Sequence, residues 1–533
     1  MTRVYTKTIR ETAEVAEDGR AGVGASAGQS APRNSSLVGS LMTAVGGLGF
    51  ALAIERGGSF LSNVLAARLG GAKNFGSYSV ALMAANNVAW YAGSGIGTTS
   101  ARFTAEHAPG AEGYCRIIRS LGIIGLISAA IAAVALWLGA APMARTLLHN
   151  EFLVTPLRAA ALSAAAFVLV ECCRGVFIGT RNFAYVLVLS VLIGVGLLAM
   201  VPRAARFGPT RMINGQSAAL FLAIGVATIL ILWRPKARPA RDVREIEPAS
   251  LGRIWRFGLM QLGGVVGMNA AGWWTASLVA RMDASLIQVA FYTAATQLRN
   301  FSSLVPSLVQ QGNLALFTDE GARDFGGAKR VIQVSSITAS ALSTVCAGLV
   351  VLMLPWALGH TYGADFTKAE LPAVLAVATL LVHFGVSPAA SRLVFVSLFW
   401  SGVVNAVWAV FVVIAGTMLV PLAGATAATA VLFLAHVISM FLNVACLKRL
   451  DALPPSVTML AVLDTLTALA ICALACFRHM VPHYSLVFSF LLLAVTVGVA
   501  SLLLRYGQNC GAFPTPLRVA SLLHSWRGQS AIR

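Results

Sequence analysis

Long apolar stretches separated by short polar segments make up the chain between residues 38 and 505. A helix needs about 20 consecutive apolar residues to cross the hydrocarbon core of a bilayer. Fourteen stretches meet this requirement, so the pattern predicts an all-α polytopic membrane protein. The predicted transmembrane helices are residues 38–67, 76–100, 117–140, 157–179, 184–202, 212–233, 255–280, 288–312, 331–357, 371–389, 392–416, 421–447, 457–477 and 484–505.

The second half of this pattern repeats features of the first half. At an offset of 214 residues Tyr78 aligns with Tyr292, and at an offset of 209 residues 215–219 align with 424–428. Each copy holds six helices, and because six is even both copies enter the membrane in the same direction. The sequence therefore predicts two parallel six-helix repeats that form two lobes around a central cavity, followed by two C-terminal helices.

Polar segments divide the chain into six predicted parts. These parts are a cytoplasmic tail (1–37), an N-lobe of helices 1–6 (38–233), a basic cytoplasmic linker (234–254), a C-lobe of helices 7–12 (255–447), helices 13 and 14 (448–505) and a second cytoplasmic tail (506–533). The first tail is polar, of mixed charge and without the apolar core of a signal peptide. We expect it to be disordered.

The composition changes how the net charge of the chain is interpreted. The chain is 57% hydrophobic and 11% charged, with a mean hydropathy of +0.78. A net charge of +19 would indicate nucleic-acid binding in a soluble protein. With a cytoplasmic N-terminus, most of the 39 Lys and Arg residues fall in cytoplasmic segments, as the positive-inside rule requires. We expect a multi-pass protein of the bacterial inner (cytoplasmic) membrane with both termini in the cytoplasm, and no nucleic-acid partner.

Two arginines interrupt the apolar pattern, Arg56 in helix 1 and Arg299 in helix 8. An arginine at the bilayer centre costs about 2.5–3.5 kcal/mol, so it usually faces a polar cavity. At an offset of 213 residues, Arg56 aligns with Asn269 and Asn86 aligns with Arg299. Each lobe would thus supply one arginine, and together they could grip one anion, phosphate above all. The alternative is structural, with an arginine paired to a carboxylate or extended to the membrane interface.

Polar stripes run along one face of helices 1, 2 and 8. Besides the arginines, these stripes include Asn63 in helix 1, Asn87 and Tyr91 in helix 2, and Tyr292 and Gln310 in helix 8. A polar helix face inside a membrane must be covered by protein or water. The stripes therefore indicate a hydrated cavity between the two lobes.

Two acidic residues inside helices are candidates for ion coupling, Glu171 in helix 4 and Asp464 in helix 13. Glu171 has an alternative role, because Arg174 follows three residues later and could pair with it. Asp464 could instead lie near the inner interface. His383 and His436 lie in apolar helices, where a lone histidine is more often a hydrogen-bonded core residue than a proton carrier.

Signals of catalysis and of cofactor binding are missing from the sequence. The eight cysteines do not have the spacing of metal ligands, and we interpret them as apolar packing residues. There is no P-loop, and the short outer loops carry no paired carboxylates. We expect no metal, no cofactor and no catalytic residue, so an enzyme is disfavoured.

Four segments, taken in order, resemble a known family. Residues 68–78, 101–106, 362–366 and 420–428 resemble the "R-x-LG…FG-x-Y", "R-x-x-AE", "YG-x-x-F" and "P-x-x-G-x-x-GAA" segments of Wzx-type polysaccharide flippases. Those flippases belong to the multidrug/oligosaccharidyl-lipid/polysaccharide (MOP) exporter superfamily. The resemblance covers most of residues 38–447, and its order and spacing are more specific than any single motif.

Lipid II flippases of that superfamily are similar in one further respect. They carry an arginine in helix 1 twelve residues before the arginine that ends the helix, as Arg56 precedes Arg68 here. Their two extra helices form a groove for a lipid tail. This chain departs from them at Ser62, where they have a further arginine, and at Asp464, which makes a purely apolar groove less certain.

The resemblance implies a transporter that moves undecaprenyl-pyrophosphate-linked oligosaccharide repeat units for exopolysaccharide, capsule or O-antigen by alternating access. Arg56 and Arg299 would then meet the pyrophosphate. The sugar would lie among Asn63, Asn87, Tyr91, Asn269, Tyr292 and Gln310. Implied partners are membrane lipid, a polysaccharide polymerase, a chain-length regulator and a coupling proton or sodium ion.

Three other functions compete with this interpretation. A multidrug or small-molecule antiporter of the same superfamily would be expected to have an acidic cavity for cationic drugs. A membrane polymerase or transferase of the same pathway would need outer-loop carboxylates. A non-transporting scaffold for glycan assembly is the third.

Overall fold

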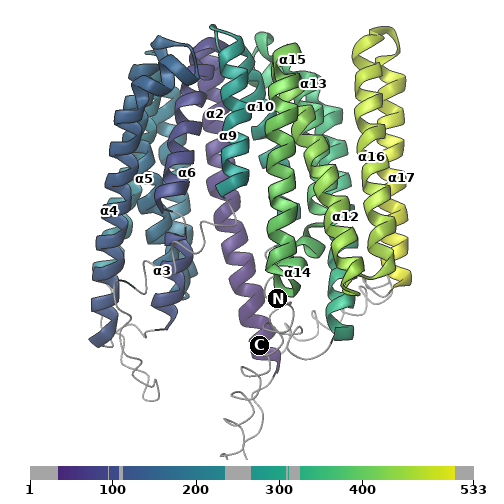
Figure 1. Ribbon diagram of the computed structural model, residues 1–533, viewed down its shortest axis with the longest axis horizontal. Coiled ribbons are helices and arrows are strands. Elements are labelled where there is room, and N and C mark those ends of the chain that lie inside the picture. Colours follow the sequence, from purple (N-terminus) through teal and green to yellow (C-terminus); the bar gives the residue numbers. More distant parts are fainter. Residues whose placement is uncertain are drawn as a thin grey trace, which may run out of the picture. The chain divides into compact units, whose positions relative to one another are not determined.

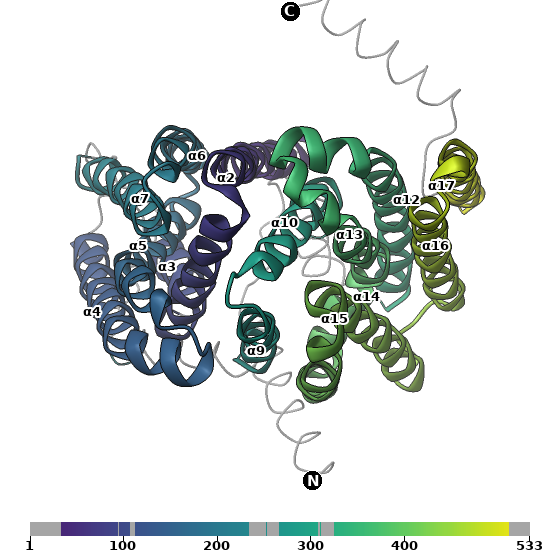
Figure 2. The same ribbon diagram turned by 90° about the horizontal axis from the view of Figure 1, so that it is seen from above.

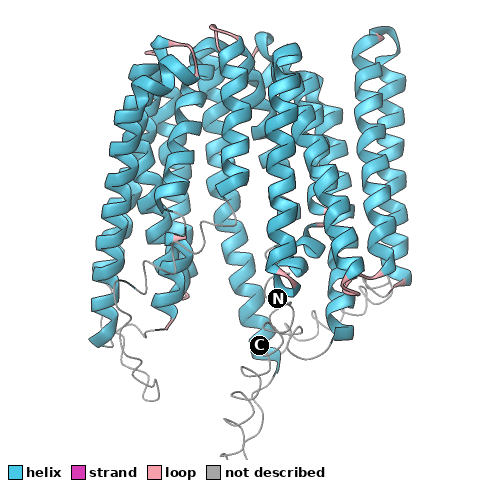
Figure 3. Ribbon diagram, in the orientation of Figure 1, coloured by secondary structure: helices cyan, strands magenta, loops and turns pink. Residues whose placement is uncertain are grey.

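The computed structural model describes residues 34–93, 95–106, 112–233, 252, 266–307, 310 and 325–510, and the regular elements among them are all helices (Figure 3). The chain divides into two compact units, Met1–Ala44 and Val45–Arg533, and the helical bundle belongs to the second. The predicted tails lie largely outside the described residues, as does the linker 234–254 apart from residue 252.

The helices follow the predicted order (Figure 1). The N-lobe contains α2 (Asn34–Gly93), α3 (Ile96–Ala105), α4 (Glu112–Pro142), α5 (Val154–Gly179), α6 (Phe183–Ala205) and α7 (Pro209–Leu232). The C-lobe contains α9 (Val266–Met282), α10 (Ile287–Ser302), α12 (Phe325–Ala357), α13 (Glu370–Phe384), α14 (Ser387–Val396) and α15 (Leu398–Arg449). The chain continues with α16 (Pro455–Met480) and α17 (Ser485–Asn509).

Within the described part of the chain, nine helices are long and apolar enough to cross a membrane. Two elements each contain two of the predicted spans, because a single break replaces a loop. In α2 the break is Gly71 (φ 76°), and in α15 it is Ala423 and Gly424 (φ 53°). Positive φ favours glycine, which lacks the Cβ that would clash there. Helices 1 and 2, and helices 11 and 12, are therefore separated by sharp breaks.

The internal repeat is visible in an irregular detail of the third helix of each lobe. α4 contains Pro142 and runs into a π-turn at Met143–Leu147, followed by a 3₁₀ turn at Glu151–Leu153. α12 contains Pro355 and runs into a π-turn at Leu358–Tyr362, followed by a 3₁₀ turn at Ala364–Ala369. The same succession at matching places supports two parallel copies of one six-helix unit.

The last two helices pack against the C-lobe beside α12 and α13 (Figure 2). Arg478 of α16 donates to Glu370 Oε1 of α13 at 2.9 Å and to the carbonyl oxygen of Val351 in α12 at 3.0 Å. The Ser340 hydroxyl of α12 donates to Asp464 Oδ2 at 2.7 Å. These polar contacts attach α16 to the lobe in addition to its apolar packing.

Candidate functional site

A cavity of about 980 Å³ lies between the two lobes. Its wall is built by α2, α3, α5, α6 and α7 from the N-lobe and by α10 and α13 from the C-lobe. The charged residues of the wall are Glu55, Arg56, Glu171, Arg174 and Arg299. Three arginines and two glutamates amount to a formal charge of +1, with the lining residue His383 counted as neutral.

Arg56 and Arg299 reach this cavity from opposite lobes. Arg56 on α2 is exposed to it, and Arg299 near the end of α10 is partly exposed. Among the described residues, no hydrogen bond or salt bridge joins either guanidinium to another group. A cation inside a membrane bundle is costly without a partner. Both guanidinium groups therefore face the cavity without a partner among the described residues, and their role as an anion site stays a prediction.

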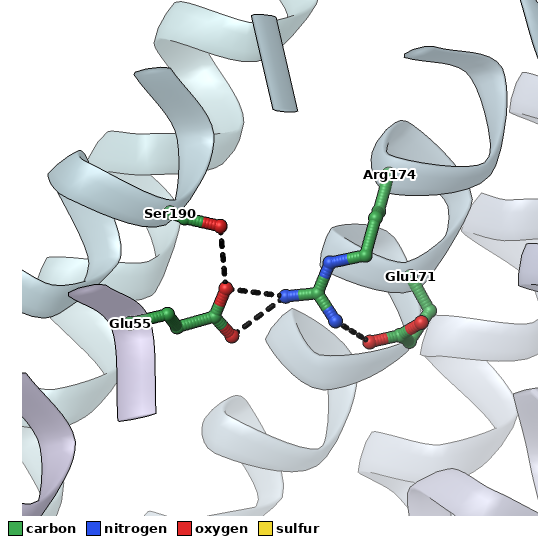
Figure 4. Close-up of polar contacts among 4 residues, drawn as sticks. All are labelled: Glu55, Glu171, Arg174 and Ser190. Carbon is green, nitrogen blue, oxygen red and sulfur yellow. Dashed lines mark hydrogen bonds and ion pairs between the residues drawn. The ribbon is translucent and has the colours of Figure 1, made fainter. Parts of the chain in front are cut away.

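The third arginine of the cavity is held by carboxylates (Figure 4). Arg174 Nη2 donates to both oxygens of Glu55, at 2.6 and 2.8 Å, and Nη1 donates to Glu171 Oε1 at 2.5 Å. The Ser190 hydroxyl of α6 donates to Glu55 Oε2 at 2.8 Å. This network links α2, α5 and α6 across the wall of the cavity and carries a net charge of −1.

Close glycine contacts lie beside this network, one of them between two of its helices, α2 and α6. A Cβ at Gly58 of α2 would lie 2.6 Å from the Cα of Gly194 in α6, one turn beyond Ser190. A Cβ at Gly175 of α5 would overlap the carbonyl oxygen of Gly97 in α3. Side chains at these positions would push the helices apart. The Gly58–Gly194 contact thus keeps Glu55 and Ser190 within hydrogen-bonding reach of each other, and the Gly175–Gly97 contact packs α3 against α5.

The structure brings together only part of the predicted set of sugar contacts. Asn63 and Gln310 line the cavity, whereas Asn87, Tyr91, Asn269 and Tyr292 are not among its lining residues. Tyr292 is only 6% exposed within α10, and the Asn87 amide donates to the carbonyl oxygen of Met83 at 3.3 Å. The roles of these four residues stay predictions.

The two candidates for ion coupling lie in different places. Glu171 lines the cavity and pairs with Arg174, as its spacing allowed. Asp464 is fully buried against α12 and α13, away from the cavity lining, with Gly385 packed against its Oδ2 atom. Its Oδ1 atom has no hydrogen-bond partner among the described residues.

Sequence reasoning missed several polar residues of the wall. Asn86, which the repeat aligned with Arg299, lines the cavity together with Gln297 and Asn300 of α10. The contact between Arg174 and Glu55 was also missed, because 119 residues separate the two. The only cue in the sequence is that each of these residues lies on the polar face of its helix.

The two histidines of the C-lobe lie beside Arg299 and differ in their surroundings. His383 lines the cavity, and its ring centroid is 5.1 Å from that of His436. His436 is 8% exposed, and its Nδ1 atom lies 2.7 Å from the carbonyl oxygen of Leu432. His436 thus has the environment of a hydrogen-bonded core residue.

The lobes touch through the segments predicted to face outward. Arg68 donates to the carbonyl oxygen of His360 at 2.8 Å, and Asn150 donates to that of Ala284 at 3.2 Å. Any side chain at Gly76, within the family-like segment 68–78, would overlap the carbonyl oxygen of Leu286 in the other lobe. These contacts hold the two lobes against each other at the end of the bundle that is predicted to face outward.

An aromatic pair also joins the two lobes, at the wall of the cavity. The rings of Phe60 and Phe301 stack at 4.6 Å between centroids, and both residues line the cavity. One comes from each lobe, so the pair spans the interface between them. Separation of the lobes would have to break this stack.

Comparison with known proteins identifies the family. The family model described as "Polysaccharide biosynthesis protein" matches residues 45–311, half of the chain. A search of curated proteins found no match.

Solved structures share the fold at low sequence identity. A lipid II flippase, MurJ, in an inward closed conformation has a TM-score of 0.61 at 11% identity, covering 86% of this chain and 98% of its own. An inward-facing multidrug resistance MATE family transporter of the MOP superfamily has a TM-score of 0.51 at 13% identity, covering 76% and 94%. The MATE multidrug transporter DinF-BH has a TM-score of 0.53 at 13% identity, covering 79% and 98%.

These neighbours are transporters or flippases rather than enzymes, and they share the two-lobed helical architecture. The fold, the apolar helices and the family match agree with the resemblance to Wzx-type flippases. The chain belongs to the family described as "Polysaccharide biosynthesis protein" and is a multi-pass membrane protein that shares the fold of the MurJ and MATE structures.

Proposed function

We propose that the protein is a flippase that carries undecaprenyl-pyrophosphate-linked oligosaccharide repeat units from the cytoplasmic to the outer leaflet of the bacterial inner membrane. The glycan would then enter exopolysaccharide, capsule or O-antigen synthesis through a polymerase and a chain-length regulator. One observation carries the proposal: two arginines without partners among the described residues, one from each lobe, line the same cavity.

The chemistry of these arginines favours a phosphate ligand. A guanidinium offers planar, paired N–H donors that match phosphate oxygens, and it keeps its charge inside a protein. A pyrophosphate bound between Arg56 and Arg299 would satisfy both cations at once. The same contacts would link the two lobes, so that binding would affect their relative movement.

The size and wall of the cavity suit a headgroup rather than a whole lipid. Its volume of about 980 Å³ lies at the upper end of the ~300–1,000 Å³ typical of small-molecule sites. Amide side chains such as Asn63, Asn86, Gln297 and Gln310 line it and can both donate and accept hydrogen bonds from sugar hydroxyls. The polyprenyl tail would stay in the surrounding lipid.

The multidrug antiporter is the main alternative, because MATE transporters share the fold. A cavity that selects cationic drugs should carry negative charge. The wall described here has a formal charge of +1, and its two arginines without partners have no counterpart among its carboxylates. The charge therefore favours an anionic passenger.

The test uses a strain with the gene deleted and complemented with wild type, Arg56→Ala, Arg299→Ala or Arg203→Ala. Arg203 is an exposed arginine of α6 outside the cavity and serves as the matched control. Surface polysaccharide is quantified, and a membrane-impermeant probe reports which leaflet holds the lipid-linked oligosaccharide.

We expect both cavity variants to lower export about 10- to 100-fold at normal expression, as loss of a charged hydrogen bond of ~1.5–3 kcal/mol predicts. Repeat units should then accumulate in the cytoplasmic leaflet, while Arg203→Ala behaves as wild type. Unchanged export in both cavity variants would refute the pyrophosphate site. Normal glycan with heightened drug sensitivity in the deletion strain would favour the antiporter, and single repeat units in the outer leaflet would indicate a polymerase.

A further inference from the structure

The charge of the cavity does not match the charge of the proposed headgroup. A diphosphate esterified at both ends keeps one strongly acidic group on each phosphate and carries two negative charges. The wall of the cavity carries a formal charge of +1. Binding would therefore leave one uncompensated negative charge in a region of low dielectric, where charge is costly.

The Glu55–Arg174–Glu171 network contains all the negative charge in the described wall of the cavity. Both carboxylates lie on the N-lobe side with Arg56, so an anion held by Arg56 would be drawn close to them. Repulsion between an arriving phosphate and a carboxylate makes protonation of that carboxylate more favourable. Uptake of one proton would raise the charge of the wall to +2 and balance a dianion.

The two carboxylates are held very differently (Figure 4). Both oxygens of Glu55 accept from Arg174, Oε2 also accepts from Ser190, and its side chain is 19% exposed. Glu171 accepts one bond from Arg174 and its side chain is 51% exposed to the cavity. Loss of charge at Glu171 breaks the fewest contacts, so Glu171 is the better proton acceptor.

Protonation of Glu171 would also change what Arg174 presents. Arg174 Nη1 has Glu171 as its carboxylate partner, and its buried Nε has no hydrogen-bond partner among the described residues. A neutral carboxyl group holds a guanidinium N–H less strongly than a carboxylate does. The freed Nη1 could then donate to a phosphate oxygen, and the bonds to Glu55 would keep the guanidinium in place.

Few other ionisable groups face Glu171. Besides Arg174, the ionisable groups that share the described lining with Glu171 are Glu55, Arg56 and Tyr78 on α2, Arg299 on α10 and His383 on α13. The neighbouring helices α3, α6 and α7 contribute Gly97, Ser190 and Gln216 to this region, none of which titrates. The pair Arg102–Glu106 lies at the far end of α3, and the thiols of Cys172 and Cys173 on α5 are buried.

We propose that Glu171 is a proton-binding site linked to the anionic headgroup: it takes up one proton as the diphosphate binds, and Arg174 turns an N–H from Glu171 to the phosphate. This rests on the proposed function, because it assumes a dianionic headgroup between Arg56 and Arg299. The proton comes from the solvent that fills the cavity, and it leaves when the headgroup leaves. Binding then becomes weaker as the pH rises.

The experiment uses the full chain in lipid nanodiscs and a synthetic short-chain prenyl diphospho-sugar as the probe. Both phosphates of this probe are esterified, so the probe itself does not titrate near neutral pH. Calorimetry at about pH 7 in buffers of different ionisation enthalpy counts the protons taken up on binding. The same titrations from about pH 6 to about pH 8 measure how affinity depends on pH.

We expect wild type to take up close to one proton per probe and to lose affinity up to about tenfold per pH unit, the limit for one linked proton. Glu171→Gln should take up none, show a flat pH profile and bind the probe at neutral pH at least as tightly as wild type. Glu171→Asp should restore proton uptake. Glu106→Gln, outside the cavity, is the matched control and should behave as wild type.

The outcomes separate this linkage from the proposed function. Binding that needs Arg56 and Arg299 but takes up no proton would refute the linkage alone. Proton uptake that persists in Glu171→Gln would refute the assignment to Glu171. If wild type does not bind the probe, or if Arg56→Ala and Arg299→Ala leave binding unchanged, the proposed function fails and the linkage fails with it.

Discussion

The two lobes share one architecture, but they present different sets of charged groups to the cavity. On the N-lobe side, Arg56 lies beside two carboxylates that already hold Arg174. On the C-lobe side, Arg299 is accompanied by His383 and by no carboxylate in the described lining. The repeat thus preserves helix order and the π-turn after the third helix, whereas the sharp breaks and the charged side chains differ between the copies.

Under the proposed function, this difference gives the two lobes different roles in binding the headgroup. In the described lining, the C-lobe offers a single permanent cation and no carboxylate that could neutralise it. The N-lobe offers positive charge that is offset by carboxylates and therefore depends on their protonation. A fixed anion site on one side and an adjustable one on the other would allow a charged headgroup to be bound and then released.

The largest expected effect comes from removing the arginines one at a time. Arg299→Ala should weaken binding of the prenyl diphospho-sugar about 100-fold, because the described part of the C-lobe wall has no second arginine or lysine. Arg56→Ala should weaken it about tenfold, because Arg174 remains on the same side; a charged hydrogen bond is worth ~1.5–3 kcal/mol. Calorimetry measures both, and Arg203→Ala is the control. Equal losses in the two variants would contradict the proposed asymmetry.

A second prediction concerns the glycine contact that supports the N-lobe network. Gly58→Ala should lower the free energy of unfolding by about 1–3 kcal/mol, because its Cβ would lie 2.6 Å from Gly194 and force α2 away from α6. Gly57→Ala meets nothing within 4 Å and should be neutral or stabilising by up to ~1 kcal/mol. Thermal unfolding in nanodiscs measures both variants. Similar melting temperatures for the two would show that the α2–α6 contact is loose.

The third prediction compares the paired carboxylate of the N-lobe, Glu55, with the buried carboxylate of α16, Asp464, which packs against the C-lobe. Glu55→Gln should cost about 1–3 kcal/mol of stability, because Arg174 would lose the carboxylate that accepts two of its three hydrogen bonds in the network. Asp464→Asn should change stability by less than ~1 kcal/mol or increase it, because the carboxylate has one hydroxyl partner and no ion pair among the described residues. Thermal unfolding again separates the two. A large loss in Asp464→Asn would point to a bound cation or to a partner outside the described residues.

The smallest expected effect concerns the first outer turn of the C-lobe, whose N-lobe equivalent is the break at Gly71. Here Asp283 caps α10 by accepting from the backbone N–H groups of Ser285, Ile287 and Gln288. Burial acts to raise the pKa of Asp283, but these bonds and that of the Ser285 hydroxyl outweigh it, so its pKa is lowered. Its stabilisation is present above the unfolded pKa of about 3.9 and is lost as the pH falls through the lower folded value.

Asp283→Ala should therefore cost about 1 kcal/mol at neutral pH, as loss of an N-cap usually does. The difference from wild type should shrink once the pH falls below about 4. Unfolding of both proteins at pH 7 and at the lowest pH that the nanodisc tolerates measures this. A difference that does not depend on pH would show that the side chain acts through packing and not through its charge.

The membrane character and the order of the helices could be read from the sequence, because each span is a local run of apolar residues. The boundaries of adjacent spans were harder to predict. Helices 1 and 2 meet at Gly71, and helices 11 and 12 meet at Gly424, without the loops that the predicted spans left between them. Such a break depends on one backbone angle, which hydropathy does not report.

Arg56 and Arg299 could also be recognised from the sequence alone, because a cation inside an apolar helix is a local anomaly. What surrounds them was decided by the tertiary structure. The link between Glu55 and Arg174 depends on close packing of α2, α5 and α6, and the polar wall depends on which turn of each helix faces the centre. The sequence by itself determined which residues could not face lipid, since that follows from local chemistry. Only the tertiary structure decided which of them meet, since that requires segments more than a hundred residues apart to lie within hydrogen-bonding distance.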